Sequence, residues 1–207
     1  MSFDPFDLKA ALPIINEDSE FFPLMSSEDE EEMNNEQIPG ILSILPLRNT
    51  VLFPCVVMPI TVGRDKSIKL IRDANKKDRI IGVVSQQDVS IEDPGFDQLN
   101  PIGTTALIIK MLQMPDGNTT VILQGKKRFR LIDEVQSEPY IKATIEPFKE
   151  VKATEDKEFK AMVSSIKDLA MNIIQLSPNI PSEAGIASRN IESTACLINF
   201  IWSNMNA

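Results

Sequence analysis

Histidine is absent from the 207-residue sequence. Without an imidazole the chain cannot form a Ser-His-Asp triad, a histidine metal site or a histidine acid–base catalyst. Neither the phosphate-binding pattern G-x-x-x-x-G-K-[ST] nor the nucleophile elbow G-x-S-x-G occurs. Ser164, Ser165 and Lys167 are close in sequence, but such neighbours on one amphipathic helix are ordinary surface residues. The sequence therefore predicts no catalytic residue, cofactor site or metal site in this chain.

Cysteines and long hydrophobic runs are also scarce. Cys55 and Cys196 are too few and too far apart for a disulfide framework or a metal-ligand motif. No apolar run approaches the roughly 20 residues that cross a bilayer. Asp4 and Asp7 stand where a signal peptide would carry positive charge. We therefore expect a cytoplasmic protein without a membrane partner.

The net charge of -9 is concentrated at one end of the chain. Residues 1–40 hold eleven acidic residues and one lysine, whereas residues 41–207 hold nineteen acidic and twenty basic residues. Because the larger part is nearly neutral, nucleic-acid binding, which needs a clustered basic surface, is not expected. The acid cluster at residues 28–32 predicts a disordered leader over residues 1–40. Four phenylalanines leave open that the leader docks on the body or on a neighbouring subunit: Phe3, Phe6, Phe21 and Phe22.

An apolar stretch interrupted by prolines opens the folded part. Residues 44–62 read ILPLRNTVLFPCVVMPITV, and their three prolines exclude a continuous helix. We predict two short strands at residues 41–47 and 56–62, paired as an opening hairpin with residues 48–54 as its apolar tip.

Further strands follow a single helix. Asp65 is the expected N-cap of a helix that ends near Lys76. Residues 88–101 form a loop, and a turn at residues 115–118 closes a hairpin. Gly125 permits a bend between two strands. The expected strands are residues 79–86, 102–114, 119–124, 127–135 and 140–148. Six or seven strands and one helix predict an α+β domain over residues 41–150, built as a bent sheet or partly closed barrel.

The apolar period changes from 2 to 3.6 at Thr154, the expected cap of a long helix. Its apolar stripe comprises Phe159, Met162, Val163, Ile166, Ala170, Ile173 and Ile174. Asn190 is the expected cap of a last helix near residues 191–203. Residues 151–207 are therefore predicted to be a helical subdomain. The last helix is apolar on nearly every side, so it either packs on the strand domain or belongs to a truncated fragment of a longer chain.

One basic cluster, residues 126–130 (KKRFR), contains an aromatic residue. In a regular strand, Lys127 and Phe129 would share one face and the other three side chains the opposite face. This cluster is either a solvated strand edge or a weak contact for an anion or a nucleic acid.

Several segments resemble the N-terminal substrate-recognition domain of Lon-type proteases. They are LPLRNTVLFP at residues 45–54, MPITVGR at 58–64, DGN followed by TTVILQGKKRFRL at 116–131, and YIKATIEPF at 140–148. The resemblance runs from about residue 41 to the end of the chain. It implies a PUA-like pseudo-barrel of six to seven strands followed by a helical subdomain.

The resemblance also implies a function. In that family the domain recognises unfolded or degron-bearing proteins in protein quality control and supports assembly of a homohexamer. The parent protein would be an ATP-dependent serine protease, with an ATP- and Mg-dependent AAA+ module and a Ser-Lys dyad outside this chain. Two alternatives remain open: a stand-alone PUA-like adaptor or ligand-binding module without a protease, and a domain that only spaces subunits.

Recognition of unfolded chains requires exposed apolar area or a free strand edge. The candidate substrate-binding residues are Leu52 and Phe53 in the apolar loop at residues 51–54, together with the flexible side chains of Met111 and Met114. The alternative for each of these residues is packing in the core.

Overall fold

The structure is a computed structural model that describes residues 33, 36–113, 119–149, 156–176, 191 and 193–203. It divides into one compact unit over residues 32–148 and a second that contains residues 149–207. We treat the two units separately. The elements of the first are β1 (Ile41–Leu47), β2 (Val57–Val62), α3 (Asp65–Asn75), β3 (Ile80–Ser85), the 3-10 helix η2 (Phe96–Gln98), β4 (Ile102–Gln113), β5 (Thr119–Gln136) and β6 (Lys142–Pro147). Those of the second are α4 (Lys157–Leu176) and α6 (Thr194–Ser203).

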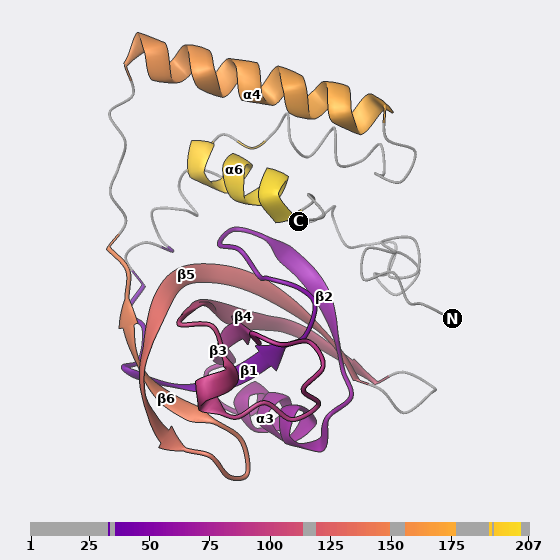
Figure 1. Cartoon of the computed structure of the whole chain (residues 1–207), viewed down its shortest axis with the longest axis vertical. Helices are drawn as coiled ribbons and strands as arrows, with labels where there is room; N and C mark the ends of the chain where they lie inside the picture. The colour runs from indigo at the N-terminus through magenta and orange to yellow at the C-terminus, as the bar shows by residue number, and fades with distance from the viewer. Residues whose placement is uncertain are drawn as a thin grey trace. The chain divides into compact units, whose positions relative to one another are not determined.

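The first unit is a nearly closed barrel (Figure 1). Its six strands follow the order β2-β5-β4-β3-β1-β6, and β5 also pairs with β6. Five strands therefore form a ring, and β2 is added to the first half of β5. The predicted α+β pseudo-barrel with one helix is confirmed. No helix within the described residues is both long enough and apolar enough to span a membrane.

The predicted opening hairpin is wrong. β1 pairs with β3 in parallel and with β6 antiparallel, whereas β2 pairs with β5. Ile44 and Leu45 explain the central place of β1, because successive side chains point to opposite faces and both are almost fully buried. A strand that is buried on both faces needs partners along both edges. Residues 48–56 consequently connect two strands that are not neighbours.

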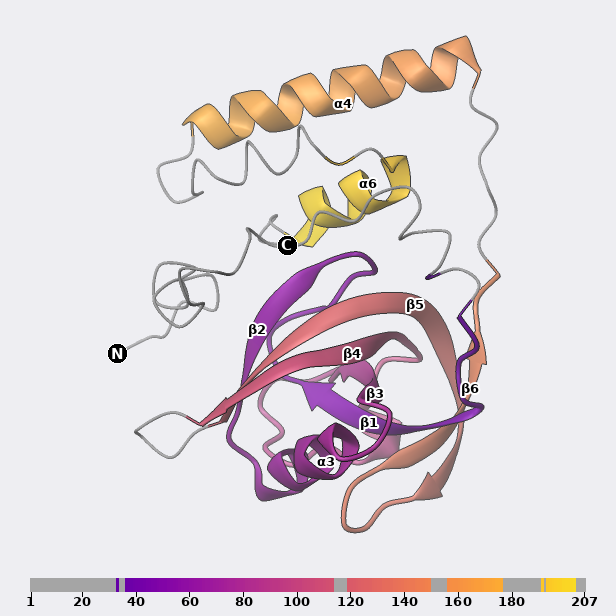
Figure 2. The same ribbon diagram turned by 180° about the vertical axis from the view of Figure 1, so that it is seen from behind.

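β5 is one long strand, where the sequence predicted two with a bend at Gly125. The ladder with β4 continues past this glycine but changes register, because Ala106 pairs with Gly125 and Thr104 with Arg128. Lys126 and Lys127 therefore face the single residue Thr105 in a β-bulge. The bulge lets the strand curve around the barrel without ending (Figures 1 and 2).

Helix α3 packs its apolar side on the barrel, where Leu70, Ile71 and Ala74 join the main core cluster. The predicted cap is displaced by one residue. Arg64 occupies the N-cap position without a capping side-chain hydrogen bond, and Asp65 is the first helical residue. Asp65 still stabilises the helix, since a negative charge in the first turn interacts favourably with the helix dipole.

A second core cluster surrounds Phe129, which is fully buried. Its ring lies over two glycines of neighbouring strands: an added Cβ would approach Phe129 Cζ to 2.9 Å at Gly82 and to 2.8 Å at Gly103. The two glycines are therefore needed to accommodate the ring.

In the second unit, polar side chains cap both described helices. The Asp156 carboxylate accepts a hydrogen bond from the backbone N–H of Phe159 at 2.8 Å at the start of α4. Ser193 Oγ accepts one from the backbone N–H of Cys196 at 3.2 Å at the start of α6. The predicted caps Thr154 and Asn190 lie outside the described residues.

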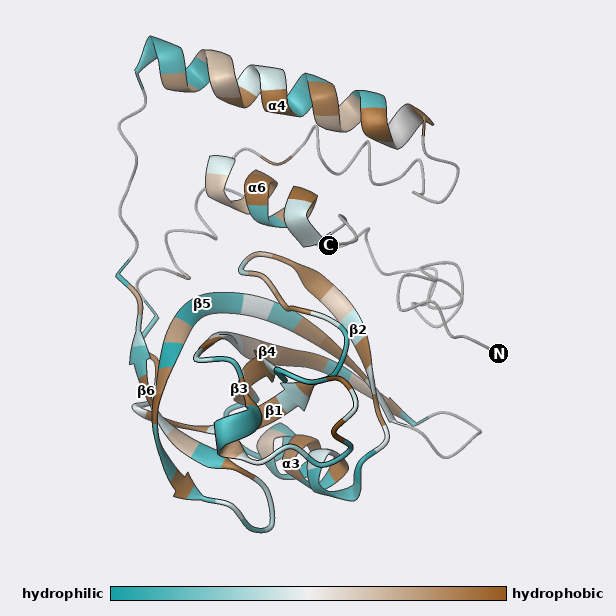
Figure 3. Ribbon diagram, viewed as in Figure 1, coloured by the Kyte–Doolittle hydropathy of each residue, from teal (hydrophilic) through white to brown (hydrophobic). Residues whose placement is uncertain are grey.

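The predicted apolar stripe of α4 is buried along one side only. Phe159, Val163 and Ala170 are buried or half-buried. A second set is exposed and follows a spacing of four, three, four and three residues: Met162, Ile166, Leu169, Ile173 and Leu176. Figure 3 shows apolar and polar bands alternating along this helix.

Candidate functional site

The apolar loop between β1 and β2 rests directly on Gly125 of β5. The N–H of Cys55 donates to the carbonyl of Gly125 at 2.9 Å, and the N–H of Gly125 donates to the carbonyl of Val56 at 2.8 Å. A Cβ at position 125 would lie 2.1 Å from the Phe53 carbonyl oxygen. Glycine is therefore required here for close approach of the loop. The approach fixes the loop on a rigid strand.

This contact determines which loop side chains are accessible. Val51 is 48% exposed and Phe53 is half-buried, whereas Leu52 is 3% exposed and belongs to the main core cluster. Leu52 therefore anchors the loop, and Val51 and Phe53 are the apolar side chains it presents.

The methionines have different positions. Met111 is half-buried and packs against the same core cluster as Leu52. Met114 lies outside the described residues. Leu52 thus lies in the core cluster, half-buried Met111 packs against that cluster, and Phe53 keeps partial access to solvent.

The sequence pattern missed three exposed apolar residues on the barrel. Ile109, Ile132 and Val135 are each the extra residue of a bulge in the β4–β5 or β5–β6 ladder. Each bulge shifts the inward–outward alternation by one residue, so Val135, which regular alternation from Phe129 would turn inward, is exposed. Runs of apolar residues without alternation, such as Leu107 to Ile109, are the signal that could have indicated them.

Two arginines, Arg48 after β1 and Arg64 at the start of α3, hold the loop that follows β3. The Arg48 side chain donates to the carbonyl of Val89, and Arg64 donates to Gln86 Oε1 at 2.8 Å. Buried Gln86 in turn donates to the carbonyl of Ile91 at 2.9 Å. Burial lowers the pKa of Arg64, and the nearby positive charge of Arg48 lowers it further. These arginines therefore have a structural role, which is to hold the loop in place.

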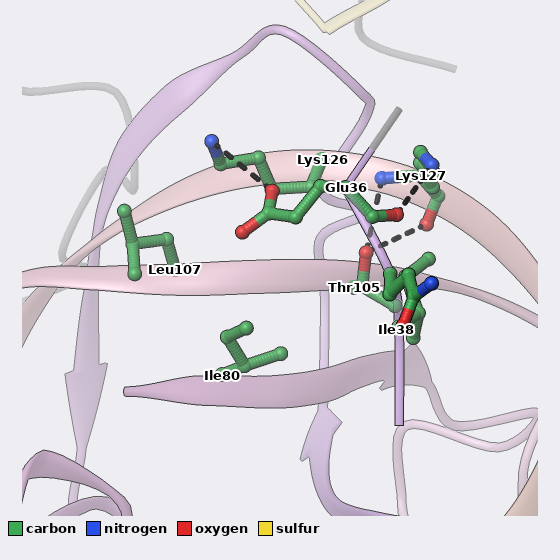
Figure 4. A pocket seen from close by; sticks show the side chains of 8 residues that line it. Glu36, Ile38, Ile80, Thr105, Leu107, Lys126 and Lys127 are labelled. Atoms are coloured by element: carbon green, nitrogen blue, oxygen red, sulfur yellow. Dashed lines mark hydrogen bonds and ion pairs between the residues drawn. The ribbon is translucent and has the colours of Figure 1, made fainter. Parts of the chain in front are cut away.

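The bulge at residues 126 and 127 carries positive charge, and with Arg128 we call it the basic bulge. Lys126 Nζ lies 3.7 Å from a carboxylate oxygen of Glu36, and Lys127 Nζ donates to the main-chain oxygen of Glu36 at 2.8 Å (Figure 4). The Thr105 hydroxyl accepts a hydrogen bond from the Lys127 N–H at 3.0 Å. The predicted strict alternation fails here, since both lysines contact the same segment.

The hollow between this segment and the strands offers little space. It is lined by Glu36, Ile38, Lys127 and their neighbours, and its volume is about 10 Å³. That is roughly the room for one water molecule. Among the described residues, no group of three or more acidic or cysteine side chains could hold a metal ion.

Strand β2 has one free edge within the described residues, because β5 is its partner on the other side. Gly125 and Val56 form a hydrogen-bonded pair, so alternation along the ladder places Pro59 in a pair that points away from β5. The missing N–H of Pro59 therefore falls on the free edge. This proline weakens the edge as a template for an added strand.

Comparison with known proteins decides the family. A model of the ATP-dependent protease La (LON) substrate-binding domain matches residues 41–207. The chain belongs to this family. The matched residues begin at the first residue of β1, so the barrel and the helical unit both lie within the LON substrate-binding domain.

The curated relatives of this chain are much longer proteins. The chain is 57% identical over 197 residues to a Lon protease of Flavobacterium johnsoniae, which covers 95% of this chain and 24% of the relative. It is 47% identical over 189 residues to a Lon protease of Cytophaga hutchinsonii, covering 91% of this chain and 23% of the relative. The chain thus spans about a quarter of the length of these curated relatives.

Solved structures support the fold. The N-terminal domain of Mycobacterium avium complex Lon protease superimposes with a TM-score of 0.62 at 19% identity, covering 81% of this chain and 84% of that one. A Lon N-terminal domain protein from Xanthomonas campestris gives a TM-score of 0.51 at 16% identity, covering 80% of this chain and 98% of that one. The fold and family predicted from the motifs at residues 45–64, 116–131 and 140–148 are confirmed.

Proposed function

We propose that this LON substrate-binding domain recognises unfolded or degron-bearing proteins for an ATP-dependent serine protease of protein quality control. The single observation that carries the proposal is the apolar loop held on Gly125, which presents Val51 and Phe53 next to a rigid strand. A stand-alone adaptor is not favoured, because the relatives of this chain are named Lon proteases.

The loop suits unfolded chains through apolar contact. Unfolded proteins expose apolar side chains that folded proteins bury. Exposed Val51 and half-buried Phe53 would therefore contact unfolded chains in preference to folded proteins. Addition of a strand to β2 is a weaker mode, because Pro59 removes one of the N–H groups that an incoming strand would use. Side-chain contact at the loop is thus the mode we favour.

The direct test measures binding of a fluorescently labelled, permanently unfolded protein to the 207-residue chain. We expect Val51→Ser together with Phe53→Ser to weaken binding by about tenfold, since removing two apolar contacts costs roughly 1–2 kcal/mol. Val135→Ser is the matched control, because Val135 is a valine of similar exposure, 52%, elsewhere on the barrel. Equal binding by all three proteins would contradict the proposal.

The proposed ATP binding and proteolysis belong to the parent protein. We propose that its AAA+ module binds ATP and Mg, that a Ser-Lys dyad outside this chain cuts the substrate, and that the protein works in the cytoplasm. The family description, which names an ATP-dependent protease, supports the ATP requirement.

We also propose that the protein self-associates into a homohexamer. It is supported by the exposed stripe of α4, whose spacing matches the core positions of a heptad repeat. We propose that this stripe packs against the same stripe of α4 in a second copy of the chain. Ser165 and Asn172 flank it at the positions where like charges would oppose pairing, and both are uncharged.

A further inference from the structure

Strand β4 has an unpaired edge over its last residues. Its ladder with β3 ends where Ile80 pairs with Leu107, and next to that pair the N–H of Ile108 donates to the carbonyl of Arg79 at 2.9 Å. Among the described residues, residues 109–113 pair with β5 alone. The ends of β4 and β5 project together from the barrel (Figures 1 and 2). We propose that this edge binds an extended segment of an unfolded protein by adding it to the sheet as a strand.

The direction of the backbone groups of β5 determines which groups of β4 turn to this edge. The N–H of Gly125 donates toward β2, to the carbonyl of Val56. Because backbone groups alternate in direction along a strand, Val121 also turns its groups toward β2. Met111 lies opposite Val121, so the N–H and C=O of Met111 point away from β5, to the free edge. Gln113, two residues further along, points its groups the same way.

A contrast with β2 supports the β4 edge as the site of strand addition. Pro59 places its missing N–H on the free edge of β2, which makes that edge a poor template. Residues 109–113 (IKMLQ) contain no proline, so the β4 edge keeps the N–H groups of Met111 and Gln113. Two donors and two acceptors at alternate positions are the pattern with which an added strand pairs.

The side chains beside the edge determine which strand fits there. Met111 packs against the main core cluster, so its neighbour Leu112 lies on the outer face of the sheet. Leu112 is half-buried, and the bulge residue Ile109 is 40% exposed. An incoming strand with apolar side chains can therefore pack against both. Lys110 disfavours pairing of this edge with the same edge of a second copy, because the two like charges would approach each other.

The occupant is an unfolded protein, so this proposal rests on the proposed function and adds a backbone contact to it. The apolar loop lies on Gly125, and Met111 pairs with Val121, four residues earlier in β5. Four strand residues span roughly 13 Å, so one extended chain can reach both places. Folded proteins keep their backbone groups paired, whereas unfolded chains have N–H and C=O groups available. The edge therefore favours unfolded segments, as the loop does.

Amide hydrogen exchange measured by NMR tests the backbone contact directly. The probe is the labelled, permanently unfolded protein, added to the 207-residue chain. We expect exchange of the Met111 and Gln113 amides to slow by about tenfold when the probe binds, because both N–H groups gain acceptors. Leu112 is the internal control, since its N–H already faces Thr120 of β5 and its exchange should not change. Unchanged exchange at Met111 and Gln113 in the bound protein would overturn the proposal.

Gln113→Pro removes one of the two donors at the edge. Proline is tolerated at an edge position and the Gln113 side chain is exposed, so the barrel should be retained, which circular dichroism establishes. The variant should bind the probe about fivefold more weakly than the wild type, because one hydrogen bond is lost. Gln113→Ala is the matched control, since it keeps the N–H and should bind as the wild type does. Equal binding by the two variants would contradict strand addition.

The loop variant Val51→Ser with Phe53→Ser separates this proposal from the function on which it rests. If strand addition alone is wrong, the loop variant binds the probe more weakly than the wild type, whereas Gln113→Pro binds it equally well. If the proposed function is wrong, the wild type and the loop variant bind the probe equally or not at all, and strand addition of substrate is then wrong as well.

Discussion

At the scale of single residues, Gly125 determines how the apolar loop is held. Alanine there would place a methyl group 2.1 Å from the Phe53 carbonyl oxygen, so the loop or the strand must shift. We expect Gly125→Ala to lower the free energy of unfolding by about 1–3 kcal/mol. Gly40→Ala is the matched control, because an added Cβ at Gly40 meets no atom within 4 Å. Equal denaturant midpoints for the two variants would refute the proposed close approach.

Tyr140 gives the barrel a dependence on alkaline pH. Burial raises the pKa of Tyr140 above 10.0, and its hydrogen bond to Asp73 acts in the same direction. Because the folded-state pKa lies above the unfolded value, this stabilisation is fully present below pH 10 and is lost as pH rises through the folded-state pKa.

The corresponding test compares the wild type with Tyr140→Phe. The variant should be less stable at neutral pH by about 0.5–1.5 kcal/mol, because it lacks the hydrogen bond. The difference should shrink above pH 10, where unfolding of the wild type is favoured by ionisation. Tyr140 is the one tyrosine in the chain, so phenolate absorbance reports its titration directly. A difference that does not change with pH would argue against the raised pKa.

At the scale of elements, the sequence allowed the strands to be located but not paired. The bounds of β1 were predicted correctly because prolines and β-branched residues mark a strand locally. Pairing of β1 with β3 depends on contacts about 38 residues apart, as in Ile44 with Gly82, which no local pattern encodes. The continuity of β5 was missed because a glycine in a strand suggests a bend, whereas Gly125 allows a loop to approach closely.

The same limit applies to the candidate binding residues. The sequence indicated residues 51–54 as candidates, but it could not separate exposed Val51 and half-buried Phe53 from the buried Leu52, since an irregular loop has no fixed alternation. Exposure of Ile132 and Val135 follows from two bulges in the β5–β6 ladder, which become apparent only when the two strands are paired.

Helix α4 carries a prediction at this scale. If its exposed stripe pairs with a second copy, the 207-residue chain should show concentration-dependent self-association in sedimentation experiments. Leu169→Glu with Ile173→Glu should give a monomer, because charges at heptad core positions disrupt the seam. Ala161→Glu with Ser164→Glu is the control, since it adds the same charge at exposed positions outside the stripe. Identical behaviour of both variants would rule out this interface.

At the scale of the whole molecule, we propose that this domain recognises substrates and that the chemistry belongs to other parts of a Lon protease. The barrel fixes the apolar loop, and the helical unit carries the exposed stripe of α4 that we propose as an assembly surface. The two roles rest on different residues, so a loop variant should retain assembly and a variant of the α4 stripe should retain substrate binding.

Degradation of an unfolded protein by the full-length parent is the decisive measurement of substrate recognition by the apolar loop. We expect Val51→Ser together with Phe53→Ser to slow ATP-dependent degradation of an unfolded protein by about tenfold, a change of roughly 1.4 kcal/mol. Cleavage of a short peptide that reaches the protease site without recognition should be unchanged. Equal loss of both activities, or full retention of protein degradation, would contradict the account.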